Sequence, residues 1–326
     1  MFVKKIFSVM VLLLFVNNVV YAQLTPEQQA AKDKGLMLYN QHKAISAVPF
    51  LTEAAEAGDQ EAQFILGEAL RKNNRYMTSE ANRWYVAAAN QGDFYAMLRL
   101  SRESSDLCEV MNNCPPSTKT PEEWLEQARE IGTAQAKEGR LVGMYIMYLA
   151  TGDLEWLERS AEAGYPQAQR LLASRYKEGK GFFILPWARQ EAVEKWLKAS
   201  AEGGNPRGMM EYVTVLYESG DMEGARHWIA QASETGFEGA IVSYGAYLAH
   251  EPDKVGYPLD RVKGYGLLSL LRELDGGGNV QVYLDDVLPV IAAKMTPEQI
   301  EEAEAFAAEW KATHPPLSFF PEKLGF

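Results

Sequence analysis

A skeleton of four positions, repeated six times, constrains the fold of this 326-residue chain more than any other feature. It comprises an aromatic residue, a small residue at plus four, a glycine at plus eight and a small residue at plus twelve. The aromatic residues are Phe50, Trp84, Trp124, Trp156, Trp196 and Trp228, and the glycines are Gly58, Gly92, Gly132, Gly164, Gly204 and Gly236. The small residues are Ala54, Ala88, Ala128, Ser160, Ser200 and Ala232 at plus four, and Ala62, Ala96, Ala136, Ala168, Gly208 and Ala240 at plus twelve. Such recurrence indicates a repeat array.

Each unit of the skeleton predicts a helical hairpin. Residues four apart lie on one face of a helix, so the large aromatic residue packs while the small residue allows a neighbouring helix to come close. Glycine at plus eight is suited to the left-handed backbone that ends a helix, and the small residue at plus twelve lies in the next helix. A lone hairpin cannot bury its apolar face, so we expect an all-α solenoid of about seven stacked antiparallel hairpins over residues 23–274. The handedness of the solenoid stays open.

Two segments resemble the Sel-one-like repeat, which is related to the tetratricopeptide repeat. One is Gln63–Ala96, with Leu66-Gly67 and the run Ala88-Ala-Asn-Gln-Gly92, and the other is Ala168–Gly204. The second also carries Gly179-Lys-Gly181, the glycine loop expected between the two helices of such a unit. The resemblance covers residues 32–276 and implies an extended concave surface, built from the first helices, that binds other proteins. The steps between the glycines vary, which predicts inter-helix loops of alternating length.

The first 22 residues have the pattern of a secretory signal peptide. Lys4 and Lys5 precede an apolar run from Ile6 to Phe15, and Val20 and Ala22 stand at minus three and minus one of the expected cleavage site. A membrane anchor is less favoured, because the run is short for a span and Asn17-Asn18 follows it. We therefore expect a soluble exported protein in the periplasm of a Gram-negative cell. Its net charge is −12, which disfavours nucleic acid as a partner. Acidity is compatible with an ordinary solvated surface or with attraction to a basic partner.

Local patterns predict helix starts and one covalent cross-link. Thr-Pro-Glu-Gln or Thr-Pro-Glu-Glu segments beginning at Thr25, Thr120 and Thr296 are typical of capping boxes with proline at the first helical position. Cys108 and Cys114 are the two cysteines of the chain, and in an oxidising compartment their closeness predicts a disulfide that closes a loop. They lack the further ligands of a metal site and the two-residue spacing of redox motifs.

Aromatic residues of the first helices and of one loop are the candidate partner-binding residues. The hexamer Phe182–Trp187 is apolar where most repeats have polar residues, so it is either a contact surface or a loop folded over the helix ends. The tyrosines are candidates for a concave face, although burial between repeats is an equally good reason for their presence. The candidates are Tyr95, Tyr145, Tyr148, Tyr176, Phe182, Phe183, Trp187, Tyr212 and Tyr217.

Residues 275–326 predict a carboxy-terminal helical cap and tail. Gly276-Gly-Gly278 is expected to break the chain before two closing helices, Val280–Met295 and Pro297–Thr313. The tail from His314 to Phe326 is too apolar to remain in water, so we expect it to dock along the last helices or to serve a partner.

Residues 257–326 also resemble the region that follows such repeats in certain exported proteins of Gram-negative bacteria. Several of those resemble immunity proteins encoded beside type VI secretion phospholipase effectors. The resemblance implies a periplasmic protein that neutralises such a secreted effector by occluding its active site. A cell-envelope scaffold or regulator of another complex is a second interpretation.

The sequence contains no motif for a reaction. It has no phosphate-binding loop, nucleophile elbow or His-Glu-x-x-His segment. The histidines His42, His227, His250 and His314 lie in different units. We therefore expect a binding protein without catalytic, cofactor-binding or metal-binding residues, and an envelope hydrolase is the least favoured alternative.

Overall fold

The computed structural model describes residues 24–102, 106–275 and 279–324, and in this part of the chain it is built of helices without strands. The predicted signal peptide (1–22) and the predicted glycine break (276–278) lie outside the described residues. The helices are α1 (Pro26–Asn40), α2 (Ala44–Glu56), α3 (Gln60–Asn74), α4 (Ser79–Asn90), α5 (Phe94–Leu100), α6 (Leu107–Val110), α7 (Pro121–Lys137), α8 (Leu141–Thr151), α9 (Leu154–Glu162), α10 (Pro166–Lys177), α11 (Pro186–Glu202), α12 (Pro206–Ser219), α13 (Met222–Ser233), α14 (Glu238–Ala249), α15 (Arg261–Leu270), η2 (Leu271–Glu273), α16 (Val280–Ala292) and α17 (Pro297–Thr313).

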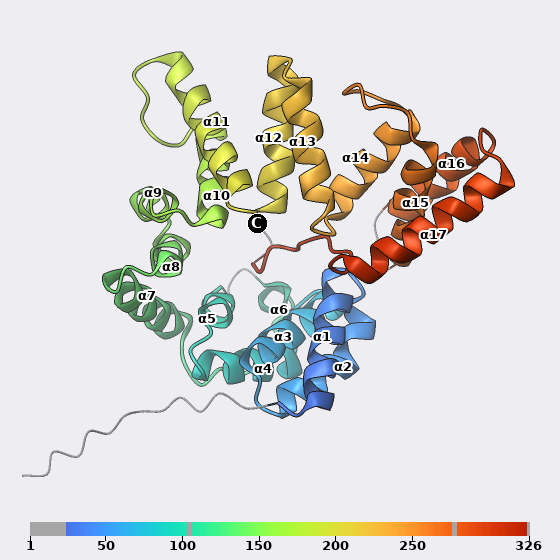
Figure 1. Cartoon of the computed structure of the whole chain (residues 1–326). Helices are drawn as coiled ribbons and strands as arrows, with labels where there is room; N and C mark the ends of the chain where they lie inside the picture. The colour runs from blue at the N-terminus through green and yellow to red at the C-terminus, as the bar shows by residue number, and fades with distance from the viewer. Residues whose placement is uncertain (1–23, 103–105, 276–278, 325–326) are drawn as a thin grey trace, which may run out of the picture.

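The helices form stacked antiparallel hairpins, as predicted. The pairs are α1/α2, α3/α4, α5/α7, α8/α9, α10/α11, α12/α13 and α14/α15, and α16 and α17 complete a helical cap. The second helix of each pair also packs on the first helix of the following pair, so one apolar core runs along the array and a second apolar cluster joins α14 and α15 to the cap. The seven-hairpin solenoid with a carboxy-terminal cap is therefore confirmed (Figure 1).

The repeated small positions explain how closely the helices approach. All six residues at plus four are fully buried. At plus twelve, Gly208 shows the reason, because a Cβ there would lie 2.3 Å from the Ser200 hydroxyl oxygen. The aromatic positions are less uniform: Trp84, Trp124 and Trp196 are buried, whereas Phe50 is 37% exposed. The small side chains at these positions therefore determine how closely the stacked helices approach one another.

The predicted helix end at Gly132 is wrong. Gly132 lies buried inside α7, and the turn after this helix uses Gly139, whose φ is +74°. At Gly132 the backbone instead approaches α8, since a Cβ there would lie 2.9 Å from Cγ2 of Ile146. In the third unit, the glycine that follows the helix lies seven residues later than the pattern predicts. Seven residues are close to two helical turns, so the shift leaves the same residues on the buried face of α7. The register error therefore leaves Trp124 and Ala128 buried.

The three predicted capping boxes are present. In each, the threonine hydroxyl accepts a hydrogen bond from the backbone N–H three residues on, and the side chain at that position accepts from the threonine N–H. They lie at the starts of α1, α7 and α17. Of these helices, α7 follows the loop that contains the cysteines, and α17 follows the turn after α16. Proline follows each threonine and fixes the first helical residue.

The array curves so far that its two ends meet. Between α1 and α2, the Gln41 amide donates to Glu273 at 2.6 Å, and Lys43 pairs with Asp275 at 2.7 Å. Both acidic partners follow α15, so the first hairpin contacts the region that joins the seventh hairpin to the cap. Figure 1 shows this near-closed arrangement, with the segment that follows α17 at its centre. No described helix combines the length and apolarity needed to cross a membrane.

Candidate protein-interaction surfaces

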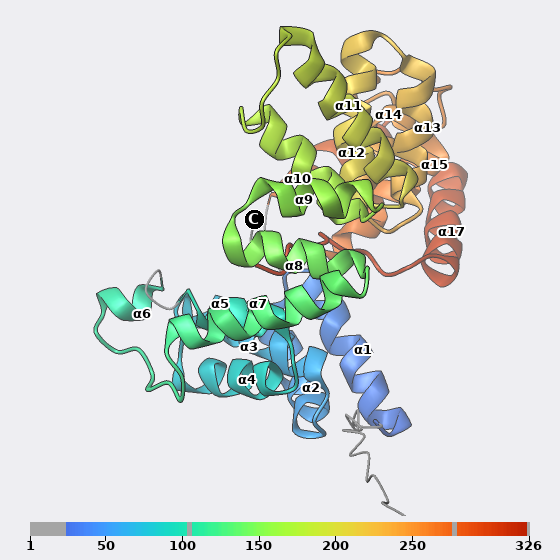
Figure 2. The same ribbon diagram turned by 90° about the vertical axis from the view of Figure 1, so that its left-hand side faces the viewer.

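The carboxy-terminal tail occupies the inner face of the array. After α17 the chain turns inward and passes α14, α12, α10 and α5 in turn, and both views place it inside the ring (Figures 1 and 2). The tail was expected to dock, but along the last helices. Only its beginning does so, through Leu317 in the core of the cap. Docking is thus confirmed and its location corrected.

Main-chain hydrogen bonds hold the first part of the tail. The Ser318 N–H donates to the Gly236 carbonyl at 2.9 Å, and the Glu238 N–H donates to the Ser318 carbonyl at 3.0 Å, which makes a short parallel bridge. The Phe319 N–H donates to the Asn40 carbonyl at 3.0 Å. The tail therefore joins the end of α1 to the start of α14 across the ring.

Side chains of the inner helices bind the next residues. Arg207 donates to the carbonyls of Phe319 and Phe320 at 2.9 and 3.0 Å. The ring of Phe319 stacks on His42, with centroids 4.1 Å apart. Phe320 meets Phe237 edge to face at 5.9 Å. These contacts fix the tail by its backbone and by aromatic packing.

The end of the described tail is bound through a carboxylate and an aliphatic side chain. Glu322 forms an ion pair with Arg170 and accepts from the Gln167 amide at 2.7 Å. Burial raises the pKa of Glu322, although Arg170 lies against it. Leu324 is 7% exposed and belongs to the main apolar core.

A cavity of about 230 Å³ remains between the tail and the inner helices. Tyr95, Tyr145, Leu149 and Tyr165 form its inner wall, and the tail from Phe320 to Leu324 forms the other. The tail therefore does not fill the inner surface completely. Of the candidate residues, only Tyr95 and Tyr145 line this cavity.

Several basic side chains of the inner face lie close to the tail, and two of them, Arg99 and Arg170, also pair with glutamates of the inner helices. Arg99, Arg170 and Arg207 converge on the tail, and Lys72 lies beside them. Burial lowers the pKa of Lys72; the charge of Glu68 opposes this shift, and the charge of Arg99 adds to it. Burial also lowers the pKa of His42, with a contribution from the charges of Lys72 and Arg207. The cations thus gather where a carboxylate of the tail is bound.

Most of the other candidate tyrosines have structural roles. Tyr148 is buried and accepts a hydrogen bond from Arg175 at 2.7 Å, and Tyr176 is buried and donates to Glu158 at 2.9 Å. Tyr212 is 6% exposed and packs against Trp228. Tyr217 alone among the candidate tyrosines presents a large exposed side chain, at 45%. The three buried tyrosines therefore pack within the array, which is the other reason that the sequence allows for their presence.

The apolar segment 182–187 forms an exposed turn between α10 and α11 together with the first two residues of α11. Phe182, Ile184, Leu185 and Trp187 are 88, 83, 44 and 59% exposed. Phe183 points inward and packs edge to face on Tyr176, with centroids 4.9 Å apart. This turn, called the apolar turn below, is therefore not folded over the helix ends, and only Phe183 packs back against the repeat.

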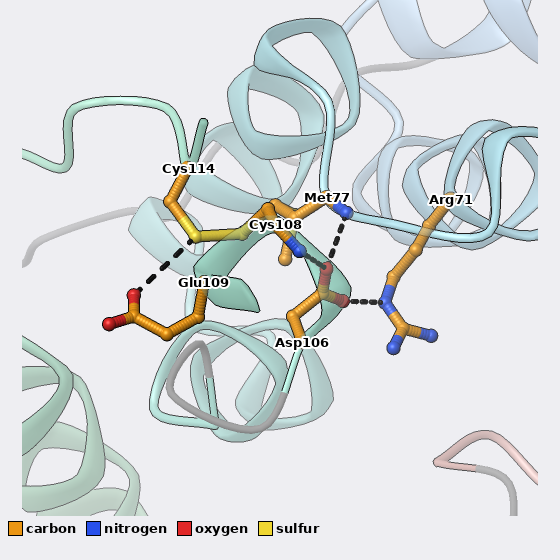
Figure 3. Close-up of a disulfide and its surroundings, with 6 residues drawn as sticks. All are labelled: Arg71, Met77, Asp106, Cys108, Glu109 and Cys114. Carbon is orange, nitrogen blue, oxygen red and sulfur yellow. Dashed lines mark hydrogen bonds and ion pairs between the residues drawn. A yellow bond between two sulfur atoms is a disulfide. The ribbon is translucent and has the colours of Figure 1, made fainter. Parts of the chain in front are cut away.

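The predicted disulfide joins Cys108 to Cys114 and closes a loop between α5 and α7 (Figure 3). Asp106 precedes it and is 4% exposed. Its carboxylate accepts from the backbone N–H groups of Met77 and Cys108 at 2.8 and 3.1 Å and from Arg71 at 2.7 Å. Burial alone would raise the pKa of Asp106, but these donors hold it below the usual value. The loop is thereby fixed to the second hairpin.

Within the described residues, no group of three or more His, Cys, Asp or Glu side chains is placed to hold a metal ion. Sequence reasoning missed the arginines of the inner face. Arg170 and Arg207 lie in the first turns of α10 and α12, close to the plus-twelve positions, but no motif indicates that they share a ligand.

No protein-family model matches the sequence, and no curated protein matches it. By fold, the chain is similar to a protective antigen present in uropathogenic Escherichia coli strains that displays an SLR fold, with 18% identity and a TM-score of 0.49. The likeness covers 89% of this chain and 62% of the antigen, so the chain spans less than two thirds of the antigen's length. It is also similar to a Sel1 repeat protein from Oxalobacter formigenes, with 19% identity, a TM-score of 0.40, and coverage of 74% of this chain and 99% of that one.

Proposed function

We propose that this chain is a protein-binding repeat protein exported to the periplasm, where it neutralises a type VI secretion phospholipase effector by occluding the mouth of its active site. The observation that carries the proposal is the apolar turn at 182–187. Four large apolar side chains are exposed next to one another there, and a contiguous exposed apolar patch is typical of an interaction site. Export rests on the signal-peptide pattern of residues 1–22.

The apolar turn is held firmly enough to act as an anchor. Arg189 donates to the carbonyls of Tyr176 and Lys180 at 2.9 and 2.6 Å, and its guanidinium lies 4.8 Å from the ring centroid of Phe183. The exposed side chains therefore extend from a fixed base. Such preorganisation reduces the entropy lost on binding.

The chemistry of the apolar turn fits the mouth of a lipid-hydrolysing enzyme. Such a mouth must accept acyl chains and is therefore apolar, and Phe182 and Trp187 are side chains that often dominate binding energy at interfaces. The net charge of −12 would speed the capture of a partner with a basic surface. The inner face holds the tail, so it is the apolar turn that offers a free contact surface.

The test combines the purified chain with the phospholipase encoded beside its gene and measures release of fatty acid from phospholipid vesicles. We expect the wild-type chain to abolish hydrolysis at a stoichiometric ratio. Phe182→Ala and Trp187→Ala should each raise the concentration needed for inhibition about 30-fold, the factor equivalent to a 2 kcal/mol anchor. Val282→Ala is the matched control, because Val282 is 64% exposed on α16 and far along the chain from the apolar turn.

Two results would contradict the proposal. One is that a variant carrying both Phe182→Ala and Trp187→Ala inhibits as strongly as the wild type. The other is lipid hydrolysis by the purified chain itself. Binding of the apolar turn to an envelope protein that hydrolyses no lipid would favour the scaffold interpretation.

A further inference from the structure

We propose that the inner face is a binding groove for an extended peptide in which a carboxylate side chain precedes an aliphatic one by two residues. In the isolated chain, residues 317–324 fill this groove, and a partner segment of the same chemistry displaces them. The proposal concerns a second surface, separate from the apolar turn, and does not depend on the effector.

Most hydrogen bonds to the tail are made with its backbone and not with its side chains. Besides the bonds of Ser318 and Phe319, Arg207 binds two successive carbonyls, and the Gln41 amide donates to the Leu317 carbonyl at 3.3 Å. Arg99 donates to the Lys323 carbonyl at 3.4 Å. Backbone bonds of this kind would form with any extended segment, as in other modes of extended-peptide recognition.

Two side chains of the tail supply selectivity. The Glu322 carboxylate is matched by Arg170 and Gln167, and an arginine paired with a carboxylate is among the stronger hydrogen-bonded contacts in proteins. Leu324, two residues later, is nearly buried in the core. Lys323 between them stays half-exposed, with its Nζ 5.0 Å from the ring centroid of Tyr95. Phe319 and Phe320 add aromatic packing earlier in the tail, so the carboxylate and the aliphatic side chain define the carboxy-terminal half of the ligand.

The groove also has room and charge beyond what the tail uses. The cavity of about 230 Å³ beside Tyr95 and Tyr145 would accept a larger side chain than the tail provides. Lys72 lies at the edge of the same surface, whereas the neighbouring Arg71 and Arg99 are already paired with Asp106 and Glu68. A competing segment with an additional acidic or aromatic residue would thus gain contacts that the tail lacks.

The tail competes as a tethered ligand. A short tether gives an effective concentration on the order of millimolar, so a free peptide must overcome this local excess. Release of the tail should therefore strengthen binding of an added peptide about tenfold or more.

The test uses the full chain and a fluorescein-labelled synthetic peptide with the sequence of residues 314–326, followed by fluorescence anisotropy. The tail is released by the double substitution Glu322→Lys and Leu324→Asp. Glu304→Lys, at an exposed position of α17, is the matched charge-reversal control. Circular dichroism verifies that each variant retains its helices.

We expect the tail-released chain to bind the peptide at least tenfold more tightly than the wild type or the Glu304→Lys control. A peptide with lysine in place of Glu322 should lose this binding and should regain it on a chain that carries Arg170→Glu and whose tail is released by Glu322→Ala and Leu324→Asp, because alanine cannot pair with the new carboxylate. Equal binding by wild-type and tail-released chains would overturn the proposal, as would no binding to a tail-released chain with intact helicity. If the lysine-containing peptide does not bind the chain with Arg170→Glu, the proposal that Arg170 recognises the carboxylate of the ligand is wrong.

Discussion

The crossing of α14 and α15 gives a sharp quantitative test of the packing, because two glycines lie at the contact. A Cβ added at Gly264 would lie 2.7 Å from the Gly245 carbonyl oxygen, 2.8 Å from the Ala249 nitrogen and 2.9 Å from the Ala249 Cβ. These atoms belong to the backbone or are fixed directly to it, so no side-chain rotation can relieve the overlap. We predict that Gly264→Ala forces the two helices apart.

The expected loss in the free energy of unfolding is obtained by comparison with Gly239, which lies in the first turn of α14. A Cβ at Gly239 would meet only the ring of Phe237, at 3.5 Å. Both substitutions replace a helical glycine by alanine, a gain of up to about 1 kcal/mol. Only Gly264→Ala adds the overpacking cost, which is about 1–3 kcal/mol. The free energy of unfolding of Gly264→Ala should therefore be lower than that of Gly239→Ala by about 1–3 kcal/mol.

The assay is urea unfolding followed by circular dichroism. A long repeat array can unfold in more than one step, so hydrogen exchange of the peptides from α14 and α15 gives a second, local readout. Faster exchange in both helices of Gly264→Ala, with Gly239→Ala like the wild type, would agree with the contact. Equal stability and equal exchange in the two variants would refute the reasoning.

Three further predictions concern titration, the disulfide and its buried acid. The pKa of His42 is lowered by burial and by two neighbouring cations, so the native state binds a proton less readily than the unfolded chain and stability falls as the pH drops below about 6.5. His42→Asn should remove this part of the pH dependence between pH 7.5 and 5.5, and parallel curves for variant and wild type would contradict it. Replacing Cys108 and Cys114 by serine should lower the free energy of unfolding by about 2 kcal/mol for so short a loop, as measured in urea, and an unchanged midpoint would argue against the cross-link. Asp106→Ala leaves buried N–H groups without their acceptor and should cost about 1–3 kcal/mol, whereas a cost within error of zero would mean that water replaces the carboxylate.

The stacked hairpins could be predicted from sequence because the small positions carry the packing. Ala54, Ser160 and Ala232 are fully buried, as their spacing from the glycines predicts. The same regularity concealed the error at Gly132, since a shift of seven residues places similar residues on the same helix face. A sequence pattern determines the face of a helix more firmly than its end.

The inner face could not be predicted because it is made by residues far apart in the chain. Local spacing does not indicate that Arg170 and Glu322 meet, or that Phe319 reaches His42. The apolar tail did predict docking, but the route depends on the curvature of the whole array, which small rotations at every hairpin determine. The buried tyrosines illustrate the same limit, since Tyr148 and Tyr212 have the same spacing whether they face a partner or a neighbouring repeat.

Hydrogen–deuterium exchange of the full chain tests most directly that the tail fills the inner face while the apolar turn stays free. The account predicts slow exchange at Ser318 and Phe319, whose amides donate to backbone carbonyls, and fast exchange at Phe182 and Ile184 in the exposed turn. Fast exchange at Ser318 and Phe319 would contradict it, because the inner face would then be open to a partner and the tail would not be its resident ligand.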